Sequence, residues 1–376
     1  MMNRYKNRQS GIECLKLFAI AMIILSHIVQ CMTQPTEFAG SQPYLFSISA
    51  PSKSVSIFIL ALFFHLGSLG NDIFFLSSAW FLLDVKTWKK EKWMRLFLQT
   101  WVISMVCLFA VLAIRHGQVP GKLILHSIFP NLFTNTWYIT AYLLFYPLAP
   151  LLNSLIEKTD KRKHFQIAAG MAWLYLVCEF IVKGAFFSSK IIQWIVIYLL
   201  LSYLKKYKRN WMDDLNINLK GLLIGLAGFI LLPGISNVVG LLTGRDTNLL
   251  YWVSNANPFL VLIAIASVNL VRRNGNFHNG VLNYLSSLSL TIYLLQSNLM
   301  FKTYYRTGLV RFFYNHFGFG HAVICKAVLM AGIIFALSLI GAILYDRILS
   351  PVVKRFSLQA LQCIRRIYHK AENRFL

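Results

Sequence analysis

The chain is poor in charged residues. Only 13% of its 376 residues are Asp, Glu, Lys or Arg, whereas water-soluble domains carry about 25%. Hydrophobic residues make up 57% of the chain, and the mean hydropathy is +0.58. This composition excludes an ordinary soluble globule, a disordered chain and a collagen. Several apolar runs have the length of about twenty residues that a membrane-spanning helix needs.

Acidic residues are scarcest, with 13 Asp and Glu against 37 Lys and Arg, so the formal net charge is +24. In a soluble protein that excess would suggest nucleic acid as a partner. Here the basic residues cluster between the apolar runs, so we expect a lipid bilayer and no nucleic acid. The cysteines lie far apart without a CxxC pair, which indicates neither a zinc site nor a disulfide framework. They are Cys14, Cys31, Cys107, Cys178, Cys325 and Cys363.

Apolar runs between charged or Gly/Pro breaks predict ten membrane-spanning helices. The predicted spans are 12–32, 56–83, 96–114, 133–152, 165–182, 191–204, 219–239, 256–271, 282–301 and 322–346. The second run is long enough to be broken, and we expect the break between Gly67 and Asp72, because irregular backbone at membrane depth must be buried in protein. The expected fold class is an all-α polytopic membrane bundle of about ten transmembrane helices with one broken helix.

The basic residues also predict the orientation of the chain. The loops on the N-terminal side of the membrane hold 26 Lys and Arg, and the opposite loops hold 9. Because cytoplasmic loops are enriched in these residues, we expect a cell (inner or plasma) membrane protein with both termini in the cytoplasm. Residues 1–350 form one membrane domain. Residues 351–376 form a basic tail with apolar residues at helical spacing, which is typical of an interfacial helix on anionic lipid.

The first span contains three ionisable residues, Glu13, Lys16 and His27. Each costs roughly 2.5 to 3.5 kcal/mol inside a membrane and is therefore a functional candidate. Lys16 and His27 are eleven residues apart, which puts them on one helix face with a rise of roughly 16 Å. Glu13 can pair with Lys16. The plain alternatives are an interfacial ion pair and an interfacial histidine. Histidine is also the usual general base near neutral pH.

These residues resemble the opening of the integral-membrane acyltransferase family 3, whose first helix reads LDxLRxxA with a histidine eleven residues after the arginine. Residues 12–19 and His27 follow that pattern, with Glu13 for Asp and Lys16 for Arg. Residues 71–82 resemble the family's VDxFFxxSGxxL signature, and residues 92–96 resemble its KRxxRL stretch.

Two later stretches agree with the same family. Residues 137–153 resemble the segment WYLxxY...PxLN, and residues 289–296 resemble SxxIYLxH. The last histidine of that pattern is Gln296 in this chain. The role of the position is therefore open, since a glutamine can donate and accept hydrogen bonds but cannot act as a base.

The resemblance implies transfer of an acyl group, usually acetyl from acetyl-CoA, to a sugar hydroxyl of an envelope or exported polysaccharide or its lipid-linked precursor. No metal is implied. Such a reaction needs a base for the hydroxyl proton, oxyanion stabilisation and cations for the CoA phosphates. His27 is the candidate base, and Lys16 and Arg95 are the candidate phosphate contacts.

Asp72 is the second candidate catalytic residue, as a group that orients His27 or binds the acceptor. Its alternative is a helix cap, and Asn71 shares both readings. The aromatic candidates for stacking on a sugar can equally be membrane-interface residues. The candidate substrate contacts are Glu13, Asn71, Trp137, Tyr138, Tyr142, Gln296 and Asn298.

Other readings of the sequence remain open. The stretch from Lys302 to His321 is predicted to be an outer loop in which Arg306 and Arg311 guide an anionic glycan, or else a plain solvated loop. A transporter or flippase of a lipid-linked glycan is the rival function, although it would more often show broken helices in both halves. A third reading is a membrane-bound sensor, but the soluble output domain that a sensor needs is not visible in the sequence. The glycan and the oligomeric state are not defined by the sequence.

The charge asymmetry makes a topology prediction. Reporter fusions after Arg209 and Arg273 should be cytoplasmic, and a fusion near Arg245 should lie outside, because positively charged loops stay on the cytoplasmic side. Paired phosphatase and fluorescent-protein reporters measure this. A cytoplasmic reading at Arg245 would show that the sixth or seventh predicted span is wrong.

Overall fold

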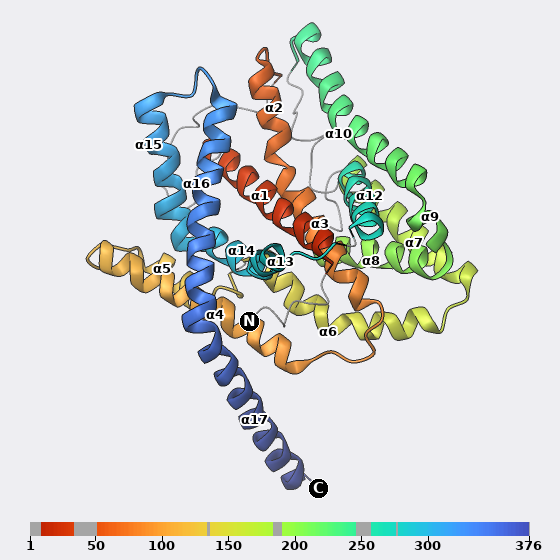
Figure 1. Cartoon of the computed structure of the whole chain (residues 1–376), viewed down its shortest axis with the longest axis vertical. Helices are drawn as coiled ribbons and strands as arrows, with labels where there is room; N and C mark the ends of the chain where they lie inside the picture. Colours follow the sequence, from red (N-terminus) through yellow and green to blue (C-terminus); the bar gives the residue numbers. More distant parts are fainter. Residues whose placement is uncertain are drawn as a thin grey trace.

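The computed structural model describes residues 9–33, 51–133, 136–182, 190–245, 257–275 and 277–375, and within these ranges every regular element is a helix (Figure 1). The α-helices are α1 (Ser10–Thr33), α2 (Val55–Phe64), α3 (Leu66–Leu82), α4 (Lys90–Ile114), α5 (Gly121–Ile128), α6 (Trp137–Glu157), α7 (Lys161–Tyr175), α8 (Lys190–Tyr207), α9 (Arg209–Asp213), α10 (Leu215–Thr243), α12 (Pro258–Asn274), α13 (Gly280–Ser287), α14 (Ser289–Ser297), α15 (Thr307–Phe317), α16 (Val323–Leu344) and α17 (Ser350–Phe375). Three π-helical segments are η2 (Leu176–Ile181), η3 (Phe301–Arg306) and η4 (Tyr345–Leu349). The predicted all-α class is confirmed.

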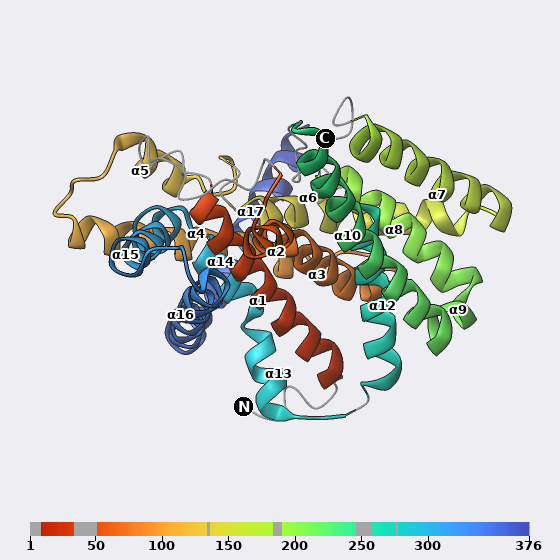
Figure 2. The same ribbon diagram turned by 90° about the horizontal axis from the view of Figure 1, so that it is seen from above.

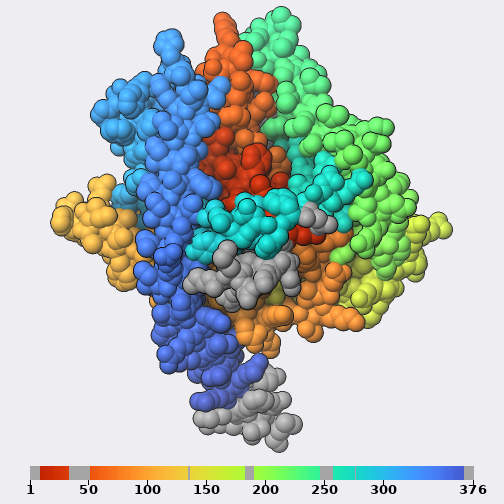
Figure 3. All heavy atoms as spheres, in the orientation of Figure 1, coloured from red at the N-terminus to blue at the C-terminus, as the bar shows by residue number. Residues whose placement is uncertain are grey.

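Helix α1 runs through the middle of the bundle and packs against α2, α3, α12, α13 and α16 (Figures 1 and 2). Fourteen of its 24 residues are buried, against five of 25 in α4 and six of 29 in α10. Figure 3 shows α1 at the centre of one face, framed by α16 and α2. The predicted functional helix is therefore the core of the protein, whereas α4 and α10 present mostly apolar surface to the outside.

Seven helical stretches in the described ranges are long and apolar enough to cross a membrane. They are Ser10–Thr33, Val55–Leu82, Lys90–Ile114, Trp137–Glu157, Lys161–Ile181, Leu215–Thr243 and Val323–Ile367. The other three predicted spans are helical but form shorter helices, namely α8, α12 and the α13–α14 pair. Seven of the nine residues of α14 are buried, and a helix enclosed by protein need not be uniformly apolar. The chain is thus a multi-pass membrane bundle, and the number of ten spans stays a prediction.

The break in the second span lies at His65, so the predicted break between Gly67 and Asp72 is wrong. His65 separates α2 from α3 with φ −104° and ψ 3°. The side chain of Ser26 on α1 donates a hydrogen bond to the carbonyl of Phe64, next to the break. Gly67 and Gly70 instead lie inside α3, where it touches α1. A β-carbon on Gly70 would lie 2.6 Å from the carbonyl oxygen of Ala19, so this glycine permits close helix packing.

A second helix is also broken, which corrects the expectation of a single broken helix. Leu288 ends α13 with φ −86° and ψ −8°, and α14 begins at Ser289. No glycine or proline marks this point in the sequence, so the usual signal for a break is missing. The predicted outer loop from Lys302 to His321 is wrong as well, because η3 and α15 occupy most of it.

The C-terminal tail is helical, as the sequence predicts. Helix α16 continues through η4 into α17, which extends beyond the rest of the molecule in Figure 1. Val353 and Ser357 are buried where α17 meets α4, whereas Phe356, Ile364 and Ile367 are exposed. Contact of these apolar side chains with lipid stays a prediction.

The close contact between α1 and α3 gives a stability prediction. Gly70→Ala should destabilise the protein by about 1–3 kcal/mol, because overpacking at a backbone contact forces the helices apart. The melting temperature in detergent measures this. Gly332→Ala is the control, since no heavy atom lies within 4 Å of a β-carbon at that position on α16. Equal melting temperatures for the two variants would contradict the packing role of Gly70.

Candidate active site

Two cavities lie along α1, and its three predicted functional residues are divided between them. The Lys16 cavity has a volume of about 260 Å³ and includes Glu13, Lys16 and Arg95 in its lining. The His27 cavity has a volume of about 560 Å³ and includes His27 and Asp72. Lys16 and His27 lie roughly 16 Å apart along the axis of α1. The cationic cavity and the cavity with the candidate base are therefore at different levels of the same helix.

Three cations gather at the Lys16 cavity, since Lys92 joins Lys16 and Arg95 there. Lys16 Nζ lies 3.3 Å from Glu13 Oε1, and the hydroxyl of Ser286 donates to Glu13 Oε2 at 2.5 Å. Glu13 is 6% exposed. The Glu13 carboxylate thus pairs with Lys16 on the same helix and accepts a hydrogen bond from α13.

The break between α13 and α14 also opens onto the Lys16 cavity. Ser289, the first residue of α14, lines it, and its buried hydroxyl has no hydrogen-bond partner among the described residues. The first turn of a helix carries unpaired N–H groups and a partial positive charge, which favour anions. Cationic side chains, a free hydroxyl and a helix N-terminus therefore face the same space.

His27 is held by α14. Its Nδ1 lies 2.8 Å from Oε1 of Gln296, which is fully buried. Asp72 does not hold it: Asp72 Oδ1 accepts from Gln193 Nε2 on α8 at 3.5 Å. The hypothesis that Asp72 orients His27 is therefore not supported, and Gln296 has that contact. The capping alternative for Asn71 and Asp72 is wrong, because α3 begins at Leu66 and both residues lie in its interior.

Unsatisfied polar atoms mark the His27 cavity. Asp72 is 3% exposed, and its Oδ2 has no partner among the described residues; the same holds for Oδ1 of Asn71. Both residues line the cavity. Buried acceptors without donors are costly, so these atoms suit a ligand that brings hydroxyl or N–H donors.

The remaining predicted substrate contacts do not lie together in one cavity. Trp137 lines the His27 cavity, with Lys190 Nζ 5.7 Å from its ring centre. Tyr138 and Tyr142 line the Lys16 cavity. Asn298 lines neither cavity; its Oδ1 accepts from the backbone N–H of Met300 at 3.0 Å, so it stabilises the turn before η3.

Sequence reasoning missed several residues at the two cavities. Lys92 stands in the basic stretch that resembles the family motif, so a signal was present. Lys190 and Gln193 lie on α8, and only the fold brings them to Asp72.

The prediction that Arg306 lies in an outer loop and guides a glycan is wrong. Arg306 is 3% exposed and donates from Nη1 to Oε1 of Gln296 at 3.3 Å and to the Gln296 carbonyl at 3.2 Å. A surface role in guiding a glycan is therefore excluded for this residue.

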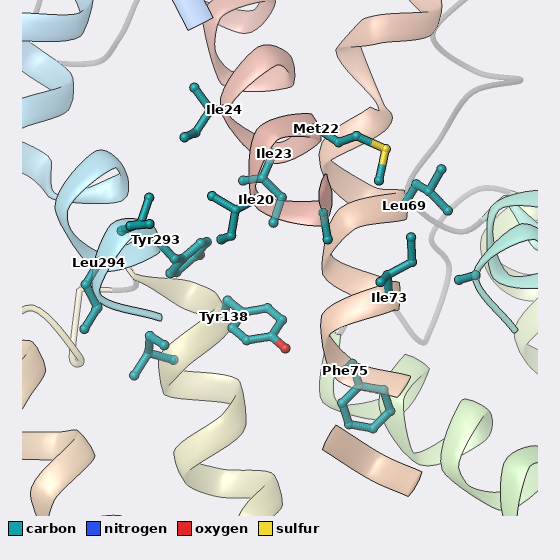
Figure 4. Close-up of a cluster of buried hydrophobic side chains, with 14 of the residues drawn as sticks. Ile20, Met22, Ile23, Ile24, Leu69, Ile73, Phe75, Tyr138, Tyr293 and Leu294 are labelled. Carbon is teal, nitrogen blue, oxygen red and sulfur yellow. The ribbon is translucent and has the colours of Figure 1, made fainter. Parts of the chain in front are cut away.

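A cluster of buried apolar side chains surrounds the part of α1 between Lys16 and His27 (Figure 4). From α1 it contains Ile20, Ile23 and Ile24, none more than 1% exposed. Tyr138 packs at 5.4 Å from Tyr293 and at 4.9 Å from Trp194, measured between ring centres. Tyr138 lines the Lys16 cavity and Trp194 lines the His27 cavity, so this ring pair is part of a partition between the two cavities.

The described ranges contain no group of three or more His, Cys, Asp or Glu side chains that could hold a metal ion. The profile of a family described as an acyltransferase domain, acyltransferase family 3, matches residues 9–347. The chain belongs to this family. No curated protein and no solved structure matches the chain significantly. The protein is thus a membrane acyltransferase, and the matched region contains both cavities and the helices around them.

Proposed function

We propose that this acyltransferase moves an acyl group, acetyl being the simplest, from acyl-CoA to a sugar hydroxyl of a cell-envelope or exported polysaccharide or its lipid-linked precursor. The observation that carries the proposal is the pair of cavities at the two ends of one buried helix, one cationic and one containing a held histidine. Acyl transfer from a nucleotide-bearing thioester needs these two environments. We place the protein in the cell membrane with both termini in the cytoplasm.

The Lys16 cavity suits the phosphates of the donor. Lys16, Lys92 and Arg95 supply positive charge from α1 and α4, and Arg in particular matches the geometry of phosphate oxygens. Ser289 and the start of α14 add hydrogen-bond donors. The negative charge of Glu13 repels a phosphate, but its two carboxylate oxygens are already bonded to Lys16 and Ser286.

His27 suits the role of general base. In the step we propose, its Nε2 takes the proton of the sugar hydroxyl while the hydroxyl oxygen forms a bond to the thioester carbon. The C–S bond then breaks, and the CoA thiolate leaves and takes up the proton from the imidazolium. No net proton or electron is gained or lost, and no further reactant is needed.

The His27 cavity suits a sugar as acceptor. Trp137 offers an aromatic face of the kind on which sugar rings stack, and the unpaired oxygens of Asn71 and Asp72 are acceptors for hydroxyl groups. A ligand rich in hydroxyls would satisfy both atoms and offset the cost of burying them.

Surface-glycan mass from cells with and without the protein tests the proposal. An acetyl mass per repeat that appears only with the protein would support it. Loss of the glycan itself would instead favour the flippase, which two broken helices would also suit. Unchanged glycan mass, together with no release of free CoA from acetyl-CoA by membranes containing the protein, would overturn the proposal.

The two ends of α1 should respond differently to mutation. His27→Ala should lower kcat for acyl transfer by about 10² to 10⁴, because that is the usual contribution of a general base, while binding of CoA is retained. Lys16→Ala should weaken CoA binding, and Lys16→Arg should preserve it. Isothermal titration with CoA and single-turnover transfer measure the two effects. If Lys16→Ala instead changes only acceptor affinity, the assignment of the cationic cavity to the donor is wrong.

The layer at Tyr138 should limit passage between the cavities. Tyr138→Trp should lower kcat without weakening CoA binding, because the larger ring fills the partition that the acyl group has to cross to reach His27. Tyr138→Phe is the matched control and should retain activity, since it keeps the ring and removes only the hydroxyl. Full activity of a stably folded Tyr138→Trp variant would show that the acyl group takes another route.

A further inference from the structure

We propose that Arg306 is a positioning residue that sets the tautomer of His27 through Gln296, and so puts the basic lone pair on the nitrogen that the reaction uses. The inference rests on the proposed function of His27 as the base. It depends on a chain of hydrogen bonds through three side chains, which come from η3, α14 and α1 in turn. Arg306 Nη1 lies 3.3 Å from Gln296 Oε1, and the same oxygen lies 2.8 Å from His27 Nδ1.

The chemistry of arginine fixes the direction of this chain of hydrogen bonds. A guanidinium group only donates, since it has no acceptor atom and stays protonated. The atom of the Gln296 amide that faces Arg306 therefore has to be the oxygen. Because that oxygen also faces His27, its partner Nδ1 must carry a proton. In neutral His27 the lone pair is then on Nε2.

The other partner of the amide cannot set this direction. Gln296 Nε2 donates to the hydroxyl of Ser297 at 2.6 Å, but a serine hydroxyl serves equally well as donor or acceptor. Without Arg306 the amide could rotate by half a turn and present its NH₂ group to His27. Nδ1 would then accept, the proton would move to Nε2, and no lone pair would be available there.

The burial of Arg306 supports a specific role. It is 3% exposed, and among the described residues it has no carboxylate partner within ion-pair distance. Burying an uncompensated cation is costly. A residue that served only to join η3 to α14 would not need a permanent charge, whereas a permanent, donor-only group is what controls the direction of an amide.

Replacement of the glutamine separates this role from a merely structural one. A carboxylate at position 296 can only accept, so Gln296→Glu holds the proton on Nδ1 whether or not Arg306 is present. Gln296→Glu should therefore restore activity in an Arg306→Met background. If Arg306 only anchors η3, the second substitution has no reason to help.

The experiment measures kcat and KM of the full-length enzyme with acetyl-CoA and the glycan acceptor identified by the mass comparison. Arg306→Met should lower kcat by about 10-fold or more, as part of the contribution of the base, with little change in either KM. Arg306→Lys should keep most of the activity. Arg306→Met with Gln296→Glu should regain at least about 10-fold in kcat. Arg273→Met, at an exposed arginine on α12, is the control for loss of a positive charge.

If Arg306→Met keeps a kcat close to that of the wild-type protein, or if the double variant recovers no kcat, the tautomer role is overturned. If Arg306→Met does not fold, Gln296→Glu and Gln296→Met in the otherwise unchanged protein test the hydrogen-bond acceptor at position 296, through which Arg306 would have to act. The first should stay active and the second should lose kcat, and equal activity of the two would overturn the proposal. Absence of transfer by the wild-type protein would count against the proposed function itself, not against the role of Arg306.

Discussion

A helix that carries ionisable groups passes through the centre of a largely apolar bundle, and the helices around it supply the partners it needs. Charged or polar side chains cannot remain unpaired away from water without a cost of several kcal/mol. Glu13 is therefore met by Ser286, and His27 by Gln296. Ser10, at the start of the same helix, donates to Asn283 at 2.8 Å. All three partners lie on α13 or α14, so this broken pair of helices is the polar counterpart of α1.

The break at Leu288 and the break at His65 have related consequences. Each divides a helix close to α1 and leaves backbone or side-chain groups turned toward it. At His65 the freed carbonyl of Phe64 is bonded by Ser26. At Leu288 the new helix start at Ser289 faces the Lys16 cavity. In both places irregular backbone is tolerated because protein, not lipid, surrounds it.

The partition around Tyr138 gives the enzyme two environments within one bundle. The ionisable side chains of α1 line the two cavities, and the layer of Ile20, Ile23, Tyr138 and Tyr293 is buried and apolar. A donor with phosphates at one end and a reactive thioester at the other matches such an arrangement, since the two ends need different surroundings. The same layer would hinder free passage of small solutes, which suits a group transferase better than a transporter.

The amino-acid sequence by itself was enough for the fold class and for singling out α1 as a helix with ionisable residues inside an apolar run. Long apolar runs predict membrane helices because length and hydropathy act locally, and ionisable residues inside such a run are conspicuous. The spacing of Lys16 and His27 follows from helix geometry alone. The motif at Gln296 pointed to a polar site as well, although the partner of that residue could not be derived from it.

Only the tertiary structure decided which groups meet. Gly67 and Gly70 read as a helix break, because their low helix propensity is local. The close contacts that make them necessary are with residues distant in the sequence, Ser26 for Gly67 and Ala19 for Gly70. Arg306 read as a surface residue because it follows an apolar run, yet η3 turns it inward onto Gln296. Asp72 met Gln193 and not His27. Such pairings depend on how helices distant in sequence pack, and neither periodicity nor spacing along one helix contains that information.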